Sequence, residues 1–284
     1  MKTEANNFFK NRIMMVCTMH GKERVMQPLI EKHLHLPSEL VANFNTDAFG
    51  TFTGEIERAH DPVTTLRMKI KKALEHAGAT LGIGNEGSFG PHPQIPFVPA
   101  DQEIAMMIDL INNLEIVATV TSTNTNFAHA EITSEEELDS FARQVHFPTH
   151  GLILKQTNEG KVSYLEKGIA NWDRLHEVYN QFKRMEGTVA AETDMRAHMN
   201  PTRMQVISEA TEQLIKNILS VCPSCHWPGF GPSEVTRGLP CGWCGAPTQR
   251  IRAVTSRCKH CDHEEEKAMN ETKADPQYCD QCNP

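Results

Sequence analysis

Apolar and polar residues alternate along the first 220 residues in a way that predicts strands followed by helices. Residues 12–18 form an apolar run typical of a buried strand. Residues 22–34 then carry apolar side chains at helical spacing. The order repeats at 61–84, where Asp61 is typical of a helix start and Gly78 of a helix end, and a short apolar strand follows.

Residues 103–122 break this alternation, because they predict a hairpin that turns at Asn112 and Asn113. Further helices are expected to begin near Ser134, Asn171 and Pro201, with strands between them. A hairpin within an alternating order favours an α/β fold with a mixed sheet flanked by helices. We expect this domain over residues 1–220, with a possible sub-boundary near 125–133, and a separate tail at 221–284.

Cysteine is concentrated in that tail, where eight of the nine cysteines form four C-x-x-C motifs. The motifs are Cys222 and Cys225, Cys241 and Cys244, Cys258 and Cys261, and Cys279 and Cys282. Four such motifs supply enough thiolates for two closed, structural Zn²⁺ sites, so the tail is predicted to be a double zinc ribbon. Redox pairs and disulfides are the alternatives, and zinc is favoured because the motif repeats so regularly.

The pairing of the four motifs is left with two possibilities. Sequential pairing, the first motif with the second and the third with the fourth, is favoured because Gly245 and Pro247 predict a turn after the second motif. Interleaved pairing would give a cross-braced module. His226, His260 or His263 could each replace a cysteine.

Charge and hydropathy narrow the range of partners. The formal net charge of −8 opposes charge-driven binding to nucleic acid or to anionic lipid. A small basic patch near Arg250 and Arg257 is followed directly by Glu264, Glu265 and Glu266. Nucleic acid is therefore an unlikely partner, and a protein partner is expected at the tail. No apolar run approaches the roughly 20 residues of a membrane span, and a secretory signal is missing, so we expect a cytoplasmic protein.

Three segments of the first hundred residues carry candidate chemistry. Thr18 and Lys22 flank a strand-to-helix turn, where free N–H groups and an ammonium could bind phosphate. Glu55 lies in a Thr- and Gly-rich segment suited to a hydrated Mg²⁺. Glu86 stands in the glycine-rich segment 84–93 after a strand, where a carboxylate can hold a metal or activate water. The plainer alternatives are a solvated lysine, a surface loop and a helix-capping glutamate.

A second polar cluster precedes the helix expected from Pro201. Asp194, Arg196, His198 and Arg203 crowd into this short stretch and could bind an anionic substrate. His198 could move a proton near neutral pH. The plainer alternative is helix capping by a neighbouring asparagine together with a salt-bridged connection to the tail.

These pieces resemble a known order of motifs. The turn at 18–22, Glu55, a Lys/Ala-rich helix, Asn85-Glu86-Gly87 and the 103–122 hairpin are similar to the inosine/xanthosine triphosphatase and Maf-like superfamily. The resemblance covers about 110 residues, and the usual asparagine of the first turn is absent. It implies Mg²⁺-dependent cleavage of a nucleoside triphosphate, with Glu86 as a metal ligand or water-positioning base and Lys22 as a phosphate contact.

The whole chain also resembles a bacterial family described as a domain of unknown function. The segments that carry this resemblance are FGTFTGEIER, NEGSFGPHPQIPF, ETDMRAHMNPTRM, GLPCGWCG and YCDQCNP. It implies a zinc-tailed cytoplasmic protein without an established activity. We therefore predict a metal-dependent nucleotide phosphohydrolase that binds a small anionic ligand, and the alternative is a non-catalytic zinc-ribbon adaptor.

Overall fold

The computed structural model describes residues 8–44 and 61–284, which form two compact units. One unit is residues 12–214. The other joins residues 1–11 to residues 215–284. Glu55 of the predicted site lies outside the described residues, so its predicted role stays a prediction.

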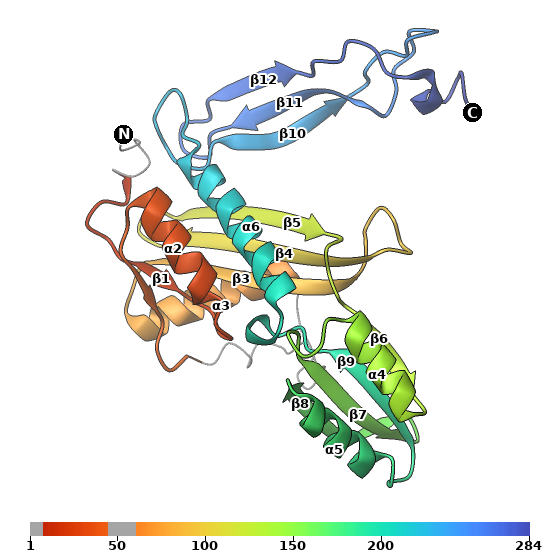
Figure 1. Ribbon diagram of the computed structural model, residues 1–284. Helices are drawn as coiled ribbons and strands as arrows, with labels where there is room; N and C mark the ends of the chain where they lie inside the picture. The colour runs from red at the N-terminus through yellow and green to blue at the C-terminus, as the bar shows by residue number, and fades with distance from the viewer. Residues whose placement is uncertain (1–7, 45–60) are drawn as a thin grey trace. The chain divides into compact units, whose positions relative to one another are not determined.

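The first sheet of the unit 12–214 is mixed, as the sequence predicts (Figure 1). Its strands are β1 (Met14–Val16), β2 (Ser38–Leu40), β3 (Leu81–Pro91), β4 (Pro99–Asp109) and β5 (Leu114–Ser122). The strand order is β2-β1-β3-β4-β5. Strand β1 runs parallel to β2 and β3, whereas β3, β4 and β5 are antiparallel. The fold class predicted from the sequence is confirmed.

Helix α3 (Pro62–Ala77) covers one face of this sheet, and its ends follow the sequence signals. The Asp61 carboxylate accepts the backbone N–H groups of the first turn, and Gly78 ends the helix in a left-handed conformation. The apolar stripe that includes Leu66, Ile70 and Leu74 is fully buried against aliphatic side chains of β4. This packing gives the α3 side of the sheet an apolar core.

Strand β3 corrects the expectation that residues 84–92 form a loop. The strand runs through Gly84, Glu86 and Gly87 and pairs with β4 along its whole length. The glycines serve packing there, because a Cβ at Gly84 would lie 2.8 Å from the Ile70 side chain. Glycine-rich sequence in this segment therefore reflects close approach of neighbouring side chains.

Helix α2 (Glu23–Leu34) follows β1, and α6 (Pro201–Leu219) begins with Asn200 as its cap, since Asn200 Oδ1 accepts the Arg203 backbone N–H at 2.9 Å. Both helices lie on the side of the first sheet opposite α3 (Figure 1). Their first turns bring Lys22 and Arg203 to this face, as the hydrogen bonds described below show.

A second, fully antiparallel sheet follows in the same unit. Its strands are β6 (His129–Ile132), β7 (Leu152–Asn158), β8 (Lys161–Ile169) and β9 (Thr188–Thr193), in the order β6-β9-β7-β8. Helices α4 (Glu135–Gln144) and α5 (Trp172–Phe182) pack on it around a core that includes Leu138 and Tyr179. Ser134 and Asn171 cap these helices as predicted. The short helix η2 (Ala197–Met199) connects β9 to α6.

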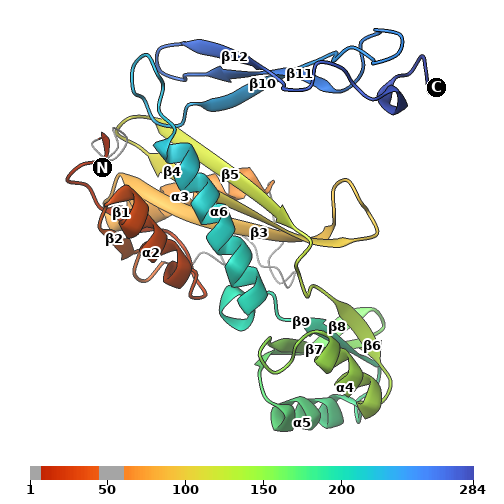
Figure 2. The same cartoon turned by 45° about the horizontal axis from the view of Figure 1, so that its top comes forward.

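The tail contains a three-stranded antiparallel sheet of β10 (Gly231–Arg237), β11 (Ile251–Arg257) and β12 (Glu264–Ala268), followed by the short helix η3 (Pro276–Tyr278). Figure 2 shows β11 running between the other two strands. Across residues 8–44 and 61–284, no helix is both long enough and apolar enough to cross a membrane.

Candidate functional site

A buried ionic cluster lies on the face of the first sheet that α2 and α6 cover. It consists of Lys22, Asn85, Asp101, Glu103 and Arg203. The Lys22 ammonium donates to the Asn85 backbone oxygen at 3.1 Å and to Asn85 Oδ1 at 2.9 Å. Burial and the Arg203 charge lower the pKa of Lys22 to about 8, although the carboxylates of Glu103 and Glu86 oppose the shift. An anion that binds nearby would therefore favour the charged form of Lys22.

Glu103 and Arg203 form the central ion pair of the buried ionic cluster. Arg203 Nε lies 2.7 Å from Glu103 Oε1, and both side chains are almost completely buried. A second guanidinium nitrogen donates to the Met195 backbone oxygen, and the guanidinium lies 5.0 Å from the centroid of Phe89. A Cβ at Gly87 would collide with Glu103 and Arg203. This glycine therefore makes room for the ion pair.

Within the buried ionic cluster, Asp101 has a pKa far from its ordinary value. It is fully buried, and its carboxylate oxygens accept no hydrogen bond from a donor among the described residues. Oε2 of Glu103 likewise accepts none there. Burial, together with the Glu103 charge and a hydrogen bond with Glu103, raises the pKa of Asp101 to about 8, although Arg203 and Lys22 oppose the shift. Because residues two apart on a strand share a face, these oxygens belong to one site.

Glu86, in contrast, points to the α3 side of the sheet. Its Oε2 lies 2.7 Å from Lys69 Nζ, and both side chains are buried. Successive residues of a strand face opposite sides, so Glu86 and the Asn85 side chain that holds Lys22 project in opposite directions. Glu86 and the Lys22 ammonium, which Asn85 holds, therefore lie on opposite faces of the sheet.

The polar cluster before α6 divides into a buried part and an exposed part. Asp194 is fully buried and accepts hydrogen bonds from Arg196 and from the Gly168 backbone N–H. His198 is exposed, and its ring stacks on His20 with 5.2 Å between centroids. Partial burial and then the Arg196 charge lower the pKa of His198. Asp194 thus holds the connection in place, and His198 is presented at the surface.

Several predicted residues come together although they lie far apart in the chain. The turn at 18–22 meets the segment before α6 through the His20–His198 stack, and Lys22 and Arg203 share the buried ionic cluster. Thr18 is buried, and its hydroxyl has no hydrogen-bond partner in the described parts of the chain. Thr18, Lys22, His198 and Arg203 are therefore brought to one region, and Glu86 faces away from it.

Sequence reasoning missed Asp101, Glu103 and Lys69, although each left a signal. Asp101 and Glu103 occupy every second position at the start of an apolar strand, which places two carboxylates on a face meant for burial. Lys69 follows Leu66 by three residues and so falls on the apolar stripe of α3. Charged residues at positions that the pattern assigns to the core are the signal that could have found them.

The eight tail cysteines form two groups that could each hold a metal ion. One group is Cys222, Cys225, Cys258 and Cys261, and the other is Cys241, Cys244, Cys279 and Cys282. Sulfur–sulfur distances are 3.6 and 3.8 Å in the first group and 3.6 and 3.9 Å in the second. Four sulfurs about 2.3 Å from a central ion would stand about 3.8 Å apart, so both groups fit a tetrahedral ion such as zinc.

The grouping is interleaved, so the prediction of sequential pairing is wrong. The antiparallel sheet explains the difference. The first motif precedes β10 and meets the third motif in the turn between β11 and β12. The second motif, between β10 and β11, meets the fourth after β12 at the other end of the sheet. The turn at Gly245 is present, but it leads into β11 and not into a separate ribbon.

All four C-x-x-C motifs share one backbone turn. In each, the residue after the second cysteine donates its N–H to the carbonyl of the first cysteine, at 2.9 to 3.2 Å. His226, Gly245 and Asp262 occupy this position with positive φ. His260 stacks on Trp227 with 4.0 Å between centroids, and His263 pairs with Glu265. Histidine therefore replaces no cysteine in either group of the described tail.

Comparison with known proteins identifies a family for most of the chain. No curated protein and no solved structure matches it. None of the comparisons links it to the inosine/xanthosine triphosphatase and Maf-like superfamily, so that resemblance stays a prediction. One family model matches residues 69–284, which include β4, the segment before α6 and all eight tail cysteines. The chain belongs to this family, which is described as a domain of unknown function (DUF6671).

Proposed function

We propose that the unit 12–214 is a phosphohydrolase that cleaves a phosphoanhydride bond of a nucleotide with the help of a divalent cation. The observation that carries the proposal is the buried ionic cluster, which lies beyond the end of β1 and against β3 and β4. Buried charges are costly, and groups with perturbed pKa values concentrate at functional sites. Ligands of α/β sheets bind beyond the carboxyl ends of parallel strands, and Lys22 lies beyond the end of β1, from where it reaches Asn85 inside β3.

The oxygens of the cluster that accept no hydrogen bond from a donor suit a cation. Mg²⁺ prefers carboxylate oxygens and is usually held by one or two carboxylates and several waters. Asp101 and Glu103 offer such oxygens, whereas Glu86 already holds Lys69. We therefore assign the cation to Asp101 and Glu103. When bound, Mg²⁺ would draw negative charge from the phosphate oxygens.

The other residues of this region would bind the substrate and move a proton. Lys22 would contact a phosphate at the start of α2, where the helix dipole also favours an anion. In hydrolysis, the oxygen of water bonds to phosphorus while the bond to the bridging oxygen breaks. His198 is suited to accept the proton of that water, because its lowered pKa favours the neutral imidazole at neutral pH. Arg196 is held by Asp194 beside it.

For the tail, we propose that both four-cysteine groups hold structural Zn²⁺. Each supplies four thiolates and leaves no open position, which is typical of structural zinc. The proposal also places the protein in the cytoplasm, because reducing conditions keep thiols available for metal. The tail metals would then have no part in the hydrolysis.

Hydrolysis can be tested on the full, metal-loaded chain with Mg²⁺ and a panel of nucleoside di- and triphosphates, by measuring phosphate and pyrophosphate release. Asp101→Asn is the informative variant, because a neutral Asp101 at pH 7 is nearly isosteric with asparagine. We expect a loss of roughly 100-fold in kcat and a higher Mg²⁺ requirement. Glu115→Gln changes a half-exposed carboxylate of β5 and is the matched control.

Two results would overturn the proposal. One is the absence of turnover by the wild-type protein on every nucleotide of the panel, which would favour the zinc-ribbon adaptor. The other is hydrolysis that Asp101→Asn and Glu115→Gln leave equally unchanged.

A further inference from the structure

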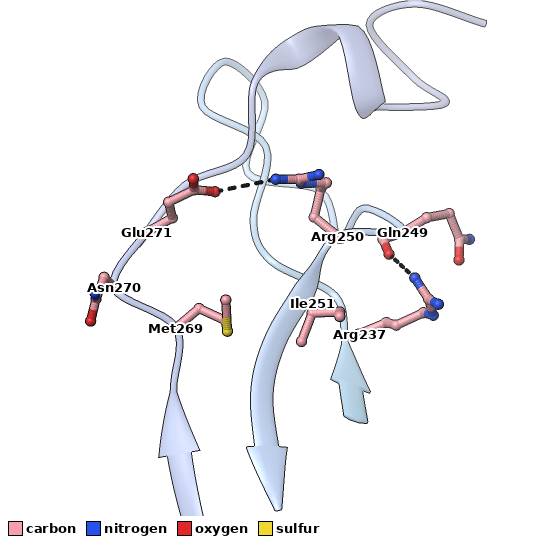
Figure 3. Close-up of a pocket in the computed structure, with 7 residues that line it drawn as sticks. All are labelled: Arg237, Gln249, Arg250, Ile251, Met269, Asn270 and Glu271. Carbon is pink, nitrogen blue, oxygen red and sulfur yellow. Dashed lines mark hydrogen bonds and ion pairs between the residues drawn. The ribbon is translucent and has the colours of Figure 1, made fainter. Parts of the chain in front are cut away.

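The tail carries a cavity of its own, at the end of the sheet next to the second four-cysteine group (Figure 3). Its volume is about 380 Å³. The end of β10, the start of β11 and the segment after β12 line it, and in an antiparallel sheet these three points lie at the same end. The cavity belongs entirely to the unit that contains the tail, so it is separate from the buried ionic cluster.

The cavity is lined by both apolar and charged side chains. Ile251 and Met269 provide apolar surface, and Met269 is 43% exposed. Arg237 and Arg250 provide two guanidinium groups. Figure 3 shows the Arg250 and Glu271 side chains pointing toward each other across the cavity. The cavity is therefore suited to a group that combines negative charge with an apolar neighbour.

Both arginines keep donors for a ligand. A guanidinium has five N–H donors. Arg237 donates one of them to the Gln249 backbone oxygen at 2.6 Å. Arg250 Nη2 lies 3.6 Å from Glu271 Oε2, which is a loose contact between two half-exposed side chains. Within the chain, the Glu271 carboxylate already contacts Arg250. The ligand that we propose carries the same chemical group.

The surface around the cavity is also unusual for a small polar module. Tyr278 is 46% exposed beside Arg250, whose guanidinium lies 4.8 Å from the ring centroid. Trp243, inside the second C-x-x-C motif, is 79% exposed. Aromatic and arginine side chains dominate the contacts of protein interfaces. Tyr278 therefore adds a rigid aromatic surface beside Arg250 on which a peptide could be ordered at low entropic cost.

We propose that this cavity binds a peptide segment of a partner protein, with an acidic side chain between Arg237 and Arg250 and an adjacent apolar side chain over Ile251 and Met269. A nucleic-acid strand is the less favoured occupant. Glu271 would face its phosphates, and β12 presents Glu264, Glu265 and Glu266 in succession. Four thiolates around each divalent ion add further negative charge, which opposes a polyanion.

The test is fluorescence anisotropy with the full, metal-loaded chain and a labelled peptide of glycine and serine that carries one central Leu-Glu-Leu. We expect binding that weakens by about tenfold or more in Arg250→Gln, because an ion pair with a desolvated carboxylate is lost. A Leu-Gln-Leu peptide should bind as weakly. Glu271→Gln should tighten binding a few-fold, since it removes the internal competitor.

Arg252→Gln is the matched control, because Arg252 is exposed on β11 and does not line the cavity. It should leave the affinity unchanged, and the metal content of each variant shows that the tail is folded. The proposal is overturned if the wild-type chain does not bind the peptide up to about 1 mM. Equal effects of Arg250→Gln and Arg252→Gln would also overturn it. So would tight, steeply salt-dependent binding of oligothymidine that Arg250→Gln abolishes, because nucleic acid would then be the ligand.

Discussion

The two units of this chain are stabilised in different ways. The unit 12–214 buries long apolar stripes such as Leu66, Ile70 and Leu74 against its first sheet. The tail sheet has few buried apolar residues, and all five residues of β12 are exposed. Its framework depends on two four-cysteine groups, one at each end of the sheet. The two units therefore differ in how much buried apolar surface they have.

In the unit 12–214, packing alone can supply the stability, so buried charges there call for another explanation. Replacing a buried ion pair by apolar residues is often neutral or stabilising. We attribute the buried charges of Lys22, Asp101, Glu103 and Arg203 to the hydrolytic site proposed above. In the tail, the eight cysteines would be the stabilising element once they bind the proposed zinc ions, and the groups available for recognition are the exposed ones.

Metal removal should separate the two units most strongly. A chelator under reducing conditions should unfold the tail, because structural zinc sites contribute on the order of 10 kcal/mol to folding. The unit 12–214 should keep its fold. Hydrogen exchange checks this: amides of β10, β11 and β12 should lose protection, and those of β3 and β4 should retain it. Persistent protection of the tail after metal removal would contradict the metal-dependent fold.

Pairs of cysteine variants test which motifs share an ion. Cys225→Ser with Cys258→Ser damages one interleaved group, so about half of the metal should remain bound. Cys225→Ser with Cys244→Ser damages both groups and should remove nearly all of it. Elemental analysis of the purified chains gives the ratio. The reverse order of the two double variants would show sequential pairing.

Breaking two different ion pairs of the first sheet should change the free energy of unfolding by very different amounts. Glu103→Gln leaves Arg203 buried without its counter-charge and should lower the free energy of unfolding by about 3–5 kcal/mol. Glu115→Gln removes the partner of Arg67 where both side chains are about one-third exposed, and it should cost about 0–1 kcal/mol. Urea unfolding monitored for the unit 12–214 measures both. Similar costs would show that burial is not what distinguishes them.

A pH dependence of stability due to Asp101 is also predicted. Its pKa is raised to about 8 in the folded chain, so between pH 4 and pH 8 the folded state holds a proton that the unfolded state has released. Stability therefore falls as pH rises through this range, by at most about 1.4 kcal/mol per pH unit from this group. Asp101→Asn should remove this slope. An unchanged slope in the variant would assign the pH dependence to other groups.

Local signals in the sequence predicted much of the fold. The caps at Asp61, Ser134 and Asn171 and the turn near Asn113 depend on neighbouring residues only, and the structure contains all of them. The glycines of β3 could not be assigned in this way. Whether Gly84 serves a turn or the approach of Ile70 depends on a helix that begins 22 residues earlier.

The site and the metal pairing depended on the same kind of distant contact. The sequence identified Lys22 and Arg203 as polar residues at helix starts, but only the folded sheet brings them together around Glu103. Likewise, all eight metal ligands were predicted, whereas their grouping follows from the strand order of the tail. Residue types indicate which side chains could bind a ligand or a metal, and the sheet topology decides which of them come together in one site.

The most direct test of the central claim is phosphate or pyrophosphate release from nucleoside triphosphates by the wild-type chain with Mg²⁺, compared with Lys22→Met. Lys72→Met, a change to an exposed lysine of α3, is the control. The account predicts turnover by the wild type and the control, and a loss of roughly 100-fold in Lys22→Met with the fold retained. Turnover by Lys22→Met equal to that of the wild type, or no turnover by any form of the chain, would contradict it.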